Sequence, residues 1–320
     1  MGINRGQALD CFRSDDLIGI GMEADAVRRR LHPEGVVSYV VARGVVCAGL
    51  SDAGFEAVYD DACAEVGATL EVGGTAVTLA SGSTGKNADY PAGEGTLRLY
   101  ERLLAEIKRQ HPAIWVSGLT VPEVRGIAAA SGLELRETLL RLRDAGLDSI
   151  GGEGADGWVA NHGNPEAWVE VHRAAHGVGM RTAAVMMFGG TETVEQRVDF
   201  LEAVRRLQEE TGGFAAVAPL PCRGGRELER ATAVESLKTL AIARMMLDTI
   251  ENVQSSWTNQ GLKVRQMGLR FGGNDVGAVL VGDGEPGANG DSEEDLRRVI
   301  RDAGFRPVQR SMSYTTMFLD

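Results

Sequence analysis

Carboxylates and a histidine gather in the segment "GGEGADGWVANHGN", residues 151–164. Glu153, Asp156 and His162 are side chains that can give and take protons near neutral pH, and Trp158 offers a flat apolar surface to a ligand. We predict the first three as catalytic acid–base residues and Trp158 as a substrate contact. Glu153 is the first choice, because glycines on both sides let backbone and ligand approach closely. A loop without ligand contact is the alternative.

Two later segments, "SSWTNQGLKVRQ" and "RFGGNDVG", combine amide, hydroxyl and aromatic side chains. Polar groups around an aromatic ring are typical of a surface that recognises a flat or polyhydroxylated ligand. Asn and Asp beside glycines are first of all turn residues, so a structural role stays equally open for Asp275. We predict Asp275 as a fourth catalytic candidate and the following residues as substrate contacts: Ser255, Trp257, Asn259, Gln260 and Asn274.

Two glycine-rich segments could hold an anionic group. "SGSTGKNADY" (81–90) fails the Walker pattern, because Ala80 replaces its first glycine and Asn87 replaces its Ser or Thr. Its backbone N–H groups could still bind a carboxylate or phosphate, with a purely structural loop as the alternative. In "MMFGGTETVEQR" (186–197), Thr193 and Gln196 fit a helix capping box, and Glu192 is the candidate for holding a ligand.

Four cysteines occur, at positions 11, 47, 63 and 222. Their spacing matches no compact metal-ligand pattern, and a disulfide framework is not expected in a reducing cytosol. We therefore expect four free thiols and assign no metal site.

Short β-branched runs alternate with amphipathic helical patterns from Val36 onward. Eight such units in this length predict an α/β protein with a (β/α)8 TIM-type barrel. A doubly wound sheet is the competitor, but the glycine fingerprint of its first crossover is missing. The predicted strands are 36–41, 75–81, 113–119, 147–152, 181–189, 214–220, 252–257 and 276–282.

We predict one domain, 1–320. It comprises an N-terminal helical extension (1–35), the barrel (36–282), and a C-terminal helix with a closing strand (283–320), the helix capped by Ser292. In a barrel of this kind, catalytic groups lie on the loops that follow the strands.

Composition sets limits on partners. The chain is 43% hydrophobic and 24% charged, with a formal net charge of −12 that is spread along its length. Nucleic-acid binding is not expected, because it depends on clustered Lys and Arg. No apolar run approaches the roughly 20 residues that span a bilayer, and the first residues do not form an apolar signal region. We expect a cytoplasmic protein without membrane contact and with a small-molecule substrate. A homodimer or a pathway partner stays open.

Several motifs carry a family resemblance, in order along the chain: "ADAVRRRLHPEGVVSYVV", "GLTVPEV", "LRETLLRLRDAGLDSI", "RTAAVMMFGGTET", "LQEETGGFAAVAPLP", "TLAIARMMLDTIENVQSSW", "NQGLKVRQMGLRFGGNDVG" and "IRDAGFRPVQR". From about residue 5 to about residue 310, the chain resembles the radical-SAM dehypoxanthine futalosine cyclases and aminofutalosine synthases of menaquinone biosynthesis. The resemblance implies a barrel of the radical-SAM kind. It also implies a [4Fe–4S] cluster, held on a C-x-x-x-C-x-x-C loop after the first strand, that splits S-adenosylmethionine.

This sequence departs from that pattern. Cys47 stands alone after the first strand, so we expect no [4Fe–4S] cluster, because ligation needs several converging thiolates. S-adenosylmethionine binding stays open without the cluster. The resemblance assigns its contacts to two loops: Ser81, Gly82 and Ser83 in the first, and Met187, Gly189 and Glu192 in the second.

Three functions follow from these observations. The first is a cluster-free enzyme of lyase, cyclase or transferase type that acts on a small nucleoside-like or carboxylated metabolite by acid–base or addition–elimination chemistry. The second is a catalytically silent paralogue that binds a ligand or a partner. The third is a radical-SAM cyclase with an atypical cluster.

Overall fold

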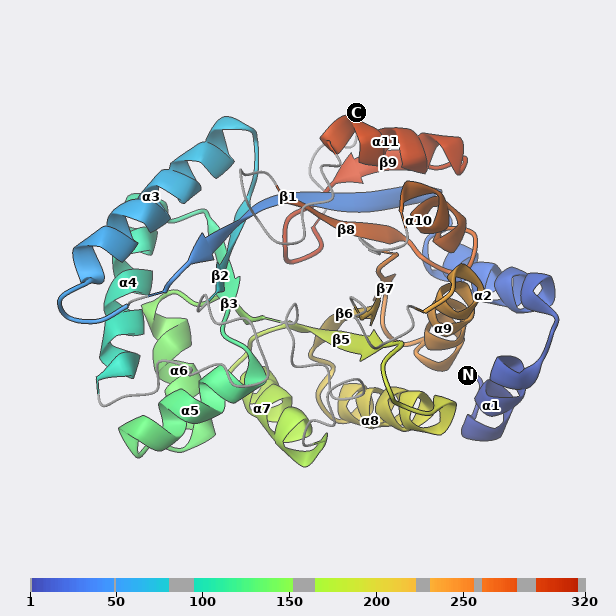
Figure 1. Cartoon of the computed structure of the whole chain (residues 1–320), viewed down its shortest axis with the longest axis horizontal. Coiled ribbons are helices and arrows are strands. Elements are labelled where there is room, and N and C mark those ends of the chain that lie inside the picture. The colour runs from blue at the N-terminus through green and yellow to red at the C-terminus, as the bar shows by residue number, and fades with distance from the viewer. Residues whose placement is uncertain are drawn as a thin grey trace.

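Parallel strands form a ring that helices surround on the outside (Figure 1). The computed structural model describes residues 2–48, 50–80, 95–151, 165–222, 231–255, 261–280 and 292–315, apart from the side chains of residues 279 and 280. The predicted α/β barrel architecture is confirmed. The strands are β1 (Val36–Val46), β2 (Ala76–Ala80), β3 (Trp115–Gly118), β4 (Ser149–Ile150), β5 (Thr182–Phe188), β6 (Phe214–Pro221), β7 (Asn252–Val253), β8 (Asp275–Leu280) and β9 (Arg306–Gln309).

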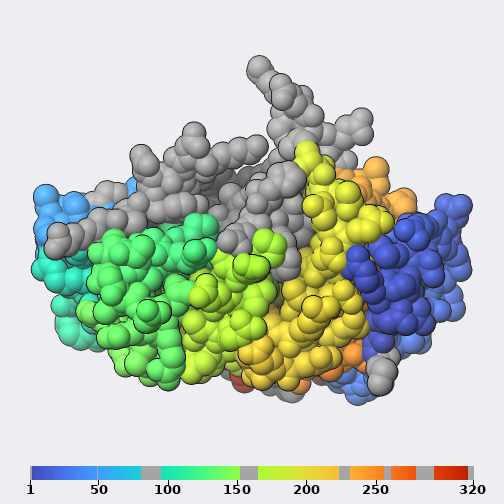
Figure 2. All heavy atoms as spheres, turned by 90° about the horizontal axis from the view of Figure 1, so that it is seen from below, coloured from blue at the N-terminus to red at the C-terminus, as the bar shows by residue number. Residues whose placement is uncertain are grey.

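The helices are α1 (Arg5–Arg13), α2 (Leu17–Leu31), α3 (Phe55–Glu71), α4 (Thr96–Gln110), α5 (Val121–Ser131), α6 (Leu135–Ala145), α7 (Pro165–Gly177), α8 (Val194–Thr211), α9 (Ala233–Met246), α10 (Leu262–Gly268) and α11 (Glu293–Asp302). In chain order α1 and α2 precede β1, α5 and α6 both follow β3, and the other helices alternate with the strands. Figure 2 shows α5 to α8 side by side on one outer face, with α1 and α2 next to them. The N-terminal helices α1 and α2 pack against α8 and α9.

Two runs of paired strands make up the ring. One has the order β4-β3-β2-β1-β8, with β9 also pairing with β1, and the other has the order β5-β6-β7. The two runs meet at an isolated parallel bridge between Gln254 and Asp275. Between β4 and β5 the described residues form no backbone ladder, but Ser149 Oγ donates a hydrogen bond to the Arg181 carbonyl at 2.8 Å. A side chain therefore links the strands at this point of the ring.

Two helix starts follow the capping chemistry that the sequence predicts. Thr193 Oγ1 accepts the Gln196 N–H at 3.2 Å, and Gln196 Oε1 accepts the Thr193 N–H at 2.7 Å. Ser292 and Asp295 make the same reciprocal pair at the start of α11. Three acidic residues in the first turn of α11 also favour this end, because the helix N-terminus carries partial positive charge. Both predicted caps are confirmed.

Helix α7 carries two histidines into the apolar layer between itself, β5 and α8. Thr182 Oγ1 lies 2.9 Å from both His172 Nδ1 and His176 Nε2, and Thr211 Oγ1 lies 2.7 Å from His176 Nδ1. Phe214 packs against both rings, at centroid distances of 5.5 and 4.7 Å. Burial lowers the pKa of His172 to about 3 and that of His176 to about 4. Both imidazoles are therefore neutral in the native protein near pH 7.

Stability is expected to fall in mild acid because of His172. The unfolded chain binds a proton at this residue below about pH 6.5, whereas the folded chain does so only near pH 3. The free energy of unfolding should therefore decrease as the pH drops from about 6.5 toward 4, by up to about 1.4 kcal/mol per pH unit for this one group. Denaturant titrations at several pH values should show a shallower slope for His172→Asn. An equal slope in variant and wild type would contradict this cause.

Within the part of the chain that the structure describes, no helix is long and apolar enough to cross a bilayer.

Candidate functional site

The turn after β5 is built around a buried carboxylate. Glu192 accepts the N–H groups of Gly189 and Gly190 at 2.7 and 2.8 Å, and its side chain has 0% exposure. Gly189 has φ +83°, and a Cβ there would lie 2.7 Å from the Ala231 Cβ, so the turn depends on glycine. The local sequence thus folds Glu192 back onto its own turn.

Arg197 completes this arrangement from α8. Its guanidinium lies 2.7 Å from the Glu192 carboxylate and 2.5 Å from that of Glu235 on α9. Nη1 also reaches the Thr239 hydroxyl at 3.4 Å. Because Glu192 already binds two N–H groups and a guanidinium, a ligand would have to compete with these contacts. Its role in cofactor binding stays a prediction.

Met187 faces the interior of the ring. Successive side chains of a strand point to opposite sides, and Ala183 and Val185, on the same side of β5 as Met187, line the internal cavity described below. Ala184 and Met186 instead join the apolar cluster beneath α8 and α9. Met187 and the Gly189 turn therefore lie at the carboxyl end of β5, where a barrel presents ligand-binding groups.

Asn274 and Asp275 lie where β8 begins, at the amino end of the strand. This position differs from the carboxyl ends of the strands, where a barrel presents its ligand-binding groups. Asn274 Oδ1 accepts the Arg244 guanidinium at 2.6 Å and the Val253 N–H at 2.9 Å, and its amide donates to Asn252 at 2.9 Å. A polar residue that precedes a buried strand can bind either a ligand or a neighbouring segment of its own chain. Asn274 binds the neighbouring strand β7.

Asp275 is fully buried and forms a two-point ion pair with Arg310 (2.5 and 2.9 Å). Ser38 Oγ donates to the same carboxylate at 2.5 Å, and the Gly277 N–H donates at 2.8 Å. Ser255 is also buried, and its hydroxyl donates to the Arg265 carbonyl at 2.9 Å. These are the contacts of structural groups, and the proposed ligand roles of Asn274, Asp275 and Ser255 stay predictions.

The other predicted site residues lie outside the described residues, so the structure places none of them. They are Ser81, Gly82 and Ser83 after β2, Glu153, Asp156, Trp158 and His162 after β4, and Trp257, Asn259 and Gln260 after β7.

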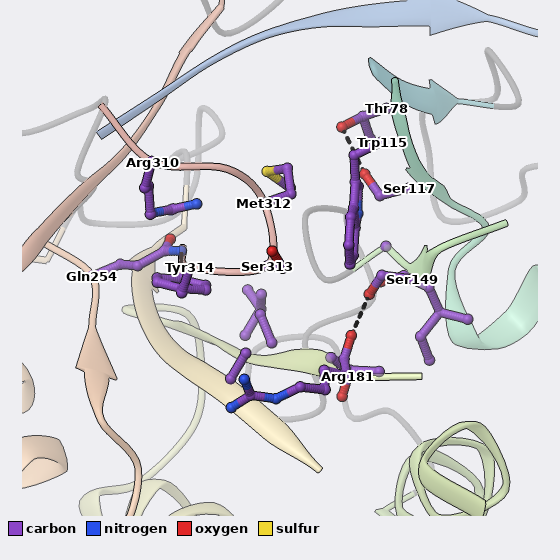
Figure 3. A pocket seen from close by; sticks show the side chains of 16 residues that line it. Thr78, Trp115, Ser117, Ser149, Arg181, Gln254, Arg310, Met312, Ser313 and Tyr314 are labelled. Carbon is purple, nitrogen blue, oxygen red and sulfur yellow. Dashed lines mark hydrogen bonds between the residues drawn. The ribbon is translucent and has the colours of Figure 1, made fainter. Parts of the chain in front are cut away.

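An internal cavity of about 70 Å³ occupies the part of the ring toward the amino ends of the strands. Polar side chains line it from β2, β3 and β4 on one side and from the C-terminal segment on the other (Figure 3). Their labelled members are Thr78, Trp115, Ser117, Ser149, Arg181, Gln254, Arg310, Ser313 and Tyr314, with Met312.

The C-terminal segment reaches this cavity because β9 pairs with the start of β1. The Arg310 N–H donates to the Tyr39 carbonyl at 2.8 Å, continuing that pairing. The Arg310 guanidinium stacks on the Tyr314 ring, 3.8 Å from its centroid, and Tyr314 Oη also bonds the Gln254 amide. Beyond the closing strand predicted from the sequence, Arg310, Met312, Ser313 and Tyr314 form part of the cavity wall.

Cys47 follows β1 directly and turns into the protein core. Its side chain is 0% exposed, within an apolar cluster that includes Phe55 and Tyr100. Burial raises the pKa of its thiol to about 12, and the nearby Glu123 acts in the same direction. This sulfur is therefore kept as a neutral thiol at physiological pH.

Comparisons with a family model and with individual proteins point to the same group of enzymes. Residues 221–319 match the family described as the CofH/MqnC C-terminal region. A cyclic dehypoxanthine futalosine synthase from Streptomyces coelicolor is 30% identical over 344 residues, covering 96% of this chain and 84% of that protein. An aminodeoxyfutalosine synthase from Thermus thermophilus is 32% identical over 237 residues, covering 67% of this chain and 64% of that protein. The chain belongs to the radical-SAM family of futalosine synthases.

A solved structure supports the fold of this futalosine-synthase family member. The crystal structure of methylornithine synthase superposes with a TM-score of 0.66 over 96% of this chain and 94% of that chain, at 15% identity. At this identity the likeness concerns the fold alone.

The four cysteines of this futalosine-synthase family member lie on separate parts of the fold. Placing the C-x-x-x-C-x-x-C spacing on Cys47 puts Ser51 and Gly54 at the other two positions. Ser51 Oγ instead accepts the Gly54 N–H at 3.0 Å, just before α3. The other three cysteines, all described, lie on α1, on α3 and after β6, and the described residues contain no group of three or more metal-binding side chains.

Sequence reasoning missed the cavity residues, although a signal for them existed. Thr78 lies in the predicted strand 75–81, Trp115 and Ser117 both lie in the predicted strand 113–119, and Arg181 begins the predicted strand 181–189. Alternation along a strand places such polar residues inside a closed barrel, where they must find partners or a ligand. No local signal could show that Arg310, far along the chain, joins them.

Proposed function

We propose that this chain is a cluster-free member of the radical-SAM family that acts on a small polar metabolite, nucleoside-like or carboxylated, by non-radical acid–base or addition–elimination chemistry. The observation that carries this proposal is the dispersal of the thiols. Cluster ligation needs several thiolates at one site, whereas Cys47 is sealed in the core and the other cysteines lie on different elements.

S-adenosylmethionine is proposed as an ordinary polar ligand of this barrel rather than a radical source. The Gly189 turn and the inward-facing Met187 lie at the carboxyl end of β5, where the family resemblance assigns cofactor contacts. Without iron to chelate its amino and carboxylate groups, the binding of this cofactor would depend on protein groups alone. Its affinity should then be lower than in cluster-bearing relatives.

Proton transfer is assigned to the loop after β4. Glu153 is the proposed acid–base residue, with Asp156 and His162 as further candidates, because Glu192 and Asp275 are already engaged in internal contacts. The thiols of Cys222 and Cys47 are poor alternatives, since burial raises the pKa of Cys222 to about 11 and that of Cys47 to about 12.

Iron analysis tests the cluster-free proposal directly. After anaerobic reconstitution with iron and sulfide and removal of unbound metal, the chain is expected to hold less than one iron and to lack the visible absorption of a cluster. The matched control is the Ser51→Cys/Gly54→Cys double variant. It supplies thiols at the family spacing, and Gly54 has φ −94°, which a cysteine can adopt. This variant should retain more iron than the wild type because the two added thiols lie outside the core, whereas Cys47 is buried in it. About three to four irons in the wild-type chain would overturn the proposal in favour of an atypical cluster.

A silent ligand-binding or partner protein is the second candidate. The observation that favours it is that Glu192, Asn274, Asp275 and Ser255, all predicted as site residues, have their polar groups engaged in the protein's own contacts. Such contacts leave fewer of the predicted site residues available for chemistry.

A further inference from the structure

We propose that the internal cavity near the amino ends of the strands is a binding site for a small carboxylic acid with a short apolar body. This site is separate from the proposed function, which concerns the opposite, carboxyl ends of the strands. The cavity is lined entirely by described residues.

The first observation is an unpaired cation. Arg181 immediately precedes β5, and its side chain runs along the lower edge of the cavity in Figure 3, opposite Met312 and Ser313. Within the described part of the chain, its guanidinium has no hydrogen bond or ion pair, and none of the residues lining the cavity is acidic. The second cation of the lining, Arg310, is neutralised by Asp275 behind the wall. Arg181 is an exposed residue, so it places a positive charge at the solvent-accessible edge of the cavity.

The second observation is a buried donor without an acceptor. Trp115 stands at the start of β3 and its ring forms one wall of the cavity (Figure 3). Its indole N–H is buried and has no hydrogen-bond partner among the residues that the structure describes. Buried polar groups in native proteins are almost always paired, so an orphaned donor beside a cavity indicates an acceptor that binds there.

The third observation concerns size and polarity. A cavity of about 70 Å³ has room for roughly five water positions, which suits a small molecule and is too little for a nucleoside. Much of the remaining wall is apolar, from Ile150, Ala183, Val185, Ala215 and Met312. An inorganic oxyanion would place charged oxygens against this apolar wall, which is costly. A carboxylate with a short alkyl chain instead satisfies both the donors and the apolar atoms.

Propionate is a suitable probe of this site, and the Trp115 indole N–H is its reporter. In ¹⁵N-labelled protein, the indole resonance that disappears in Trp115→Phe is assigned to this residue. We expect it to shift saturably as propionate is added. Propionamide, or sodium chloride at the same ionic strength, should leave it in place, because neither provides a carboxylate.

Substitutions distinguish a built site from unspecific binding. Arg181→Gln should raise the apparent Kd for propionate about tenfold or more, the usual effect of losing a charge-assisted hydrogen bond. The control is Arg136→Gln, which removes an exposed cation from α6 away from the cavity, and it should change the Kd less than twofold. Trp115→Phe should weaken propionate binding, which is measured for this variant by thermal shift because it lacks the indole reporter. The Tm of the ligand-free variant should equal or exceed that of the wild type, since the substitution removes an unsatisfied donor.

Two results would overturn the proposal. One is an indole resonance that propionate does not move, and the other is an unchanged Kd in Arg181→Gln. A site in the proposed catalytic mouth would respond to neither Arg181→Gln nor Trp115→Phe, so failure here leaves the proposed function standing.

Discussion

Asp275→Ala is expected to lower the free energy of unfolding by about 3–5 kcal/mol, the range measured when one partner of a buried ion pair is removed. Asp275 is 0% exposed and Arg310 is 2% exposed, so neither charge has water to replace its partner. The substitution would also leave the Ser38 hydroxyl and the Gly277 N–H without their acceptor. Chemical denaturation of wild type and variant measures the difference.

The exposed pair between Asp52 and Arg98 provides the matched control. Its atoms are as close, 2.6 Å, but the side chains are 74% and 67% exposed. Asp52→Ala should therefore cost less than about 1 kcal/mol. In a double-mutant cycle, Asp275→Ala with Arg310→Met should cost clearly less than the sum of the single changes, because the second substitution removes the stranded charge. A loss below about 1 kcal/mol for Asp275→Ala alone would contradict this account.

The order of elements could be predicted because it depends on local pattern. All eight barrel strands appear where β-branched runs were found. Thr193 and Ser292 each form a capping box with the residue three positions later in the chain. Strand ends were less predictable. The predicted strands at 147–152 and 252–257 pair over two residues each, in β4 and β7, because pairing length depends on neighbours that are distant in sequence.

The site was harder to predict than the fold. A buried carboxylate such as Asp275 can serve catalysis or an ion pair, and its partner Arg310 is 35 residues away on a segment that enters the ring only because β9 pairs with β1. Glu192 was predicted to hold a ligand, but its carboxylate binds its own turn and Arg197 on α8. Residue type singled out Asp275 and Glu192 as polar groups with a specific role, whereas tertiary contacts decide which partner each carboxylate binds.

Arg244 on α9 is a further residue whose loss should strongly destabilise the protein. Its side chain is 0% exposed, and burial, together with the nearby Arg28, lowers its pKa to about 9. The guanidinium donates to the carbonyls of Gly272 (2.8 Å), Ile250 (3.1 Å) and Glu251 (3.0 Å) and to Asn274 Oδ1 (2.6 Å). One side chain thus binds the segments that lead into β7 and β8.

Arg244→Met keeps most of the apolar stem but removes the side-chain donor of the Gly272 and Ile250 carbonyls. Asn274 Oδ1 keeps the Val253 N–H and the Glu251 carbonyl keeps His32 Nε2. Each unsatisfied buried group costs about 1–3 kcal/mol, partly offset because burying the cation itself is costly, so we expect a net loss of about 3–5 kcal/mol in the free energy of unfolding. Arg244→Lys should recover little of it, because an ammonium lacks the planar fork that reaches several carbonyls at once. Arg109→Met on α4, where the side chain is 67% exposed, is the control and should cost less than about 1 kcal/mol. Equal denaturation midpoints for Arg244→Met and Arg109→Met would show that Arg244 does not hold β7 and β8 in place.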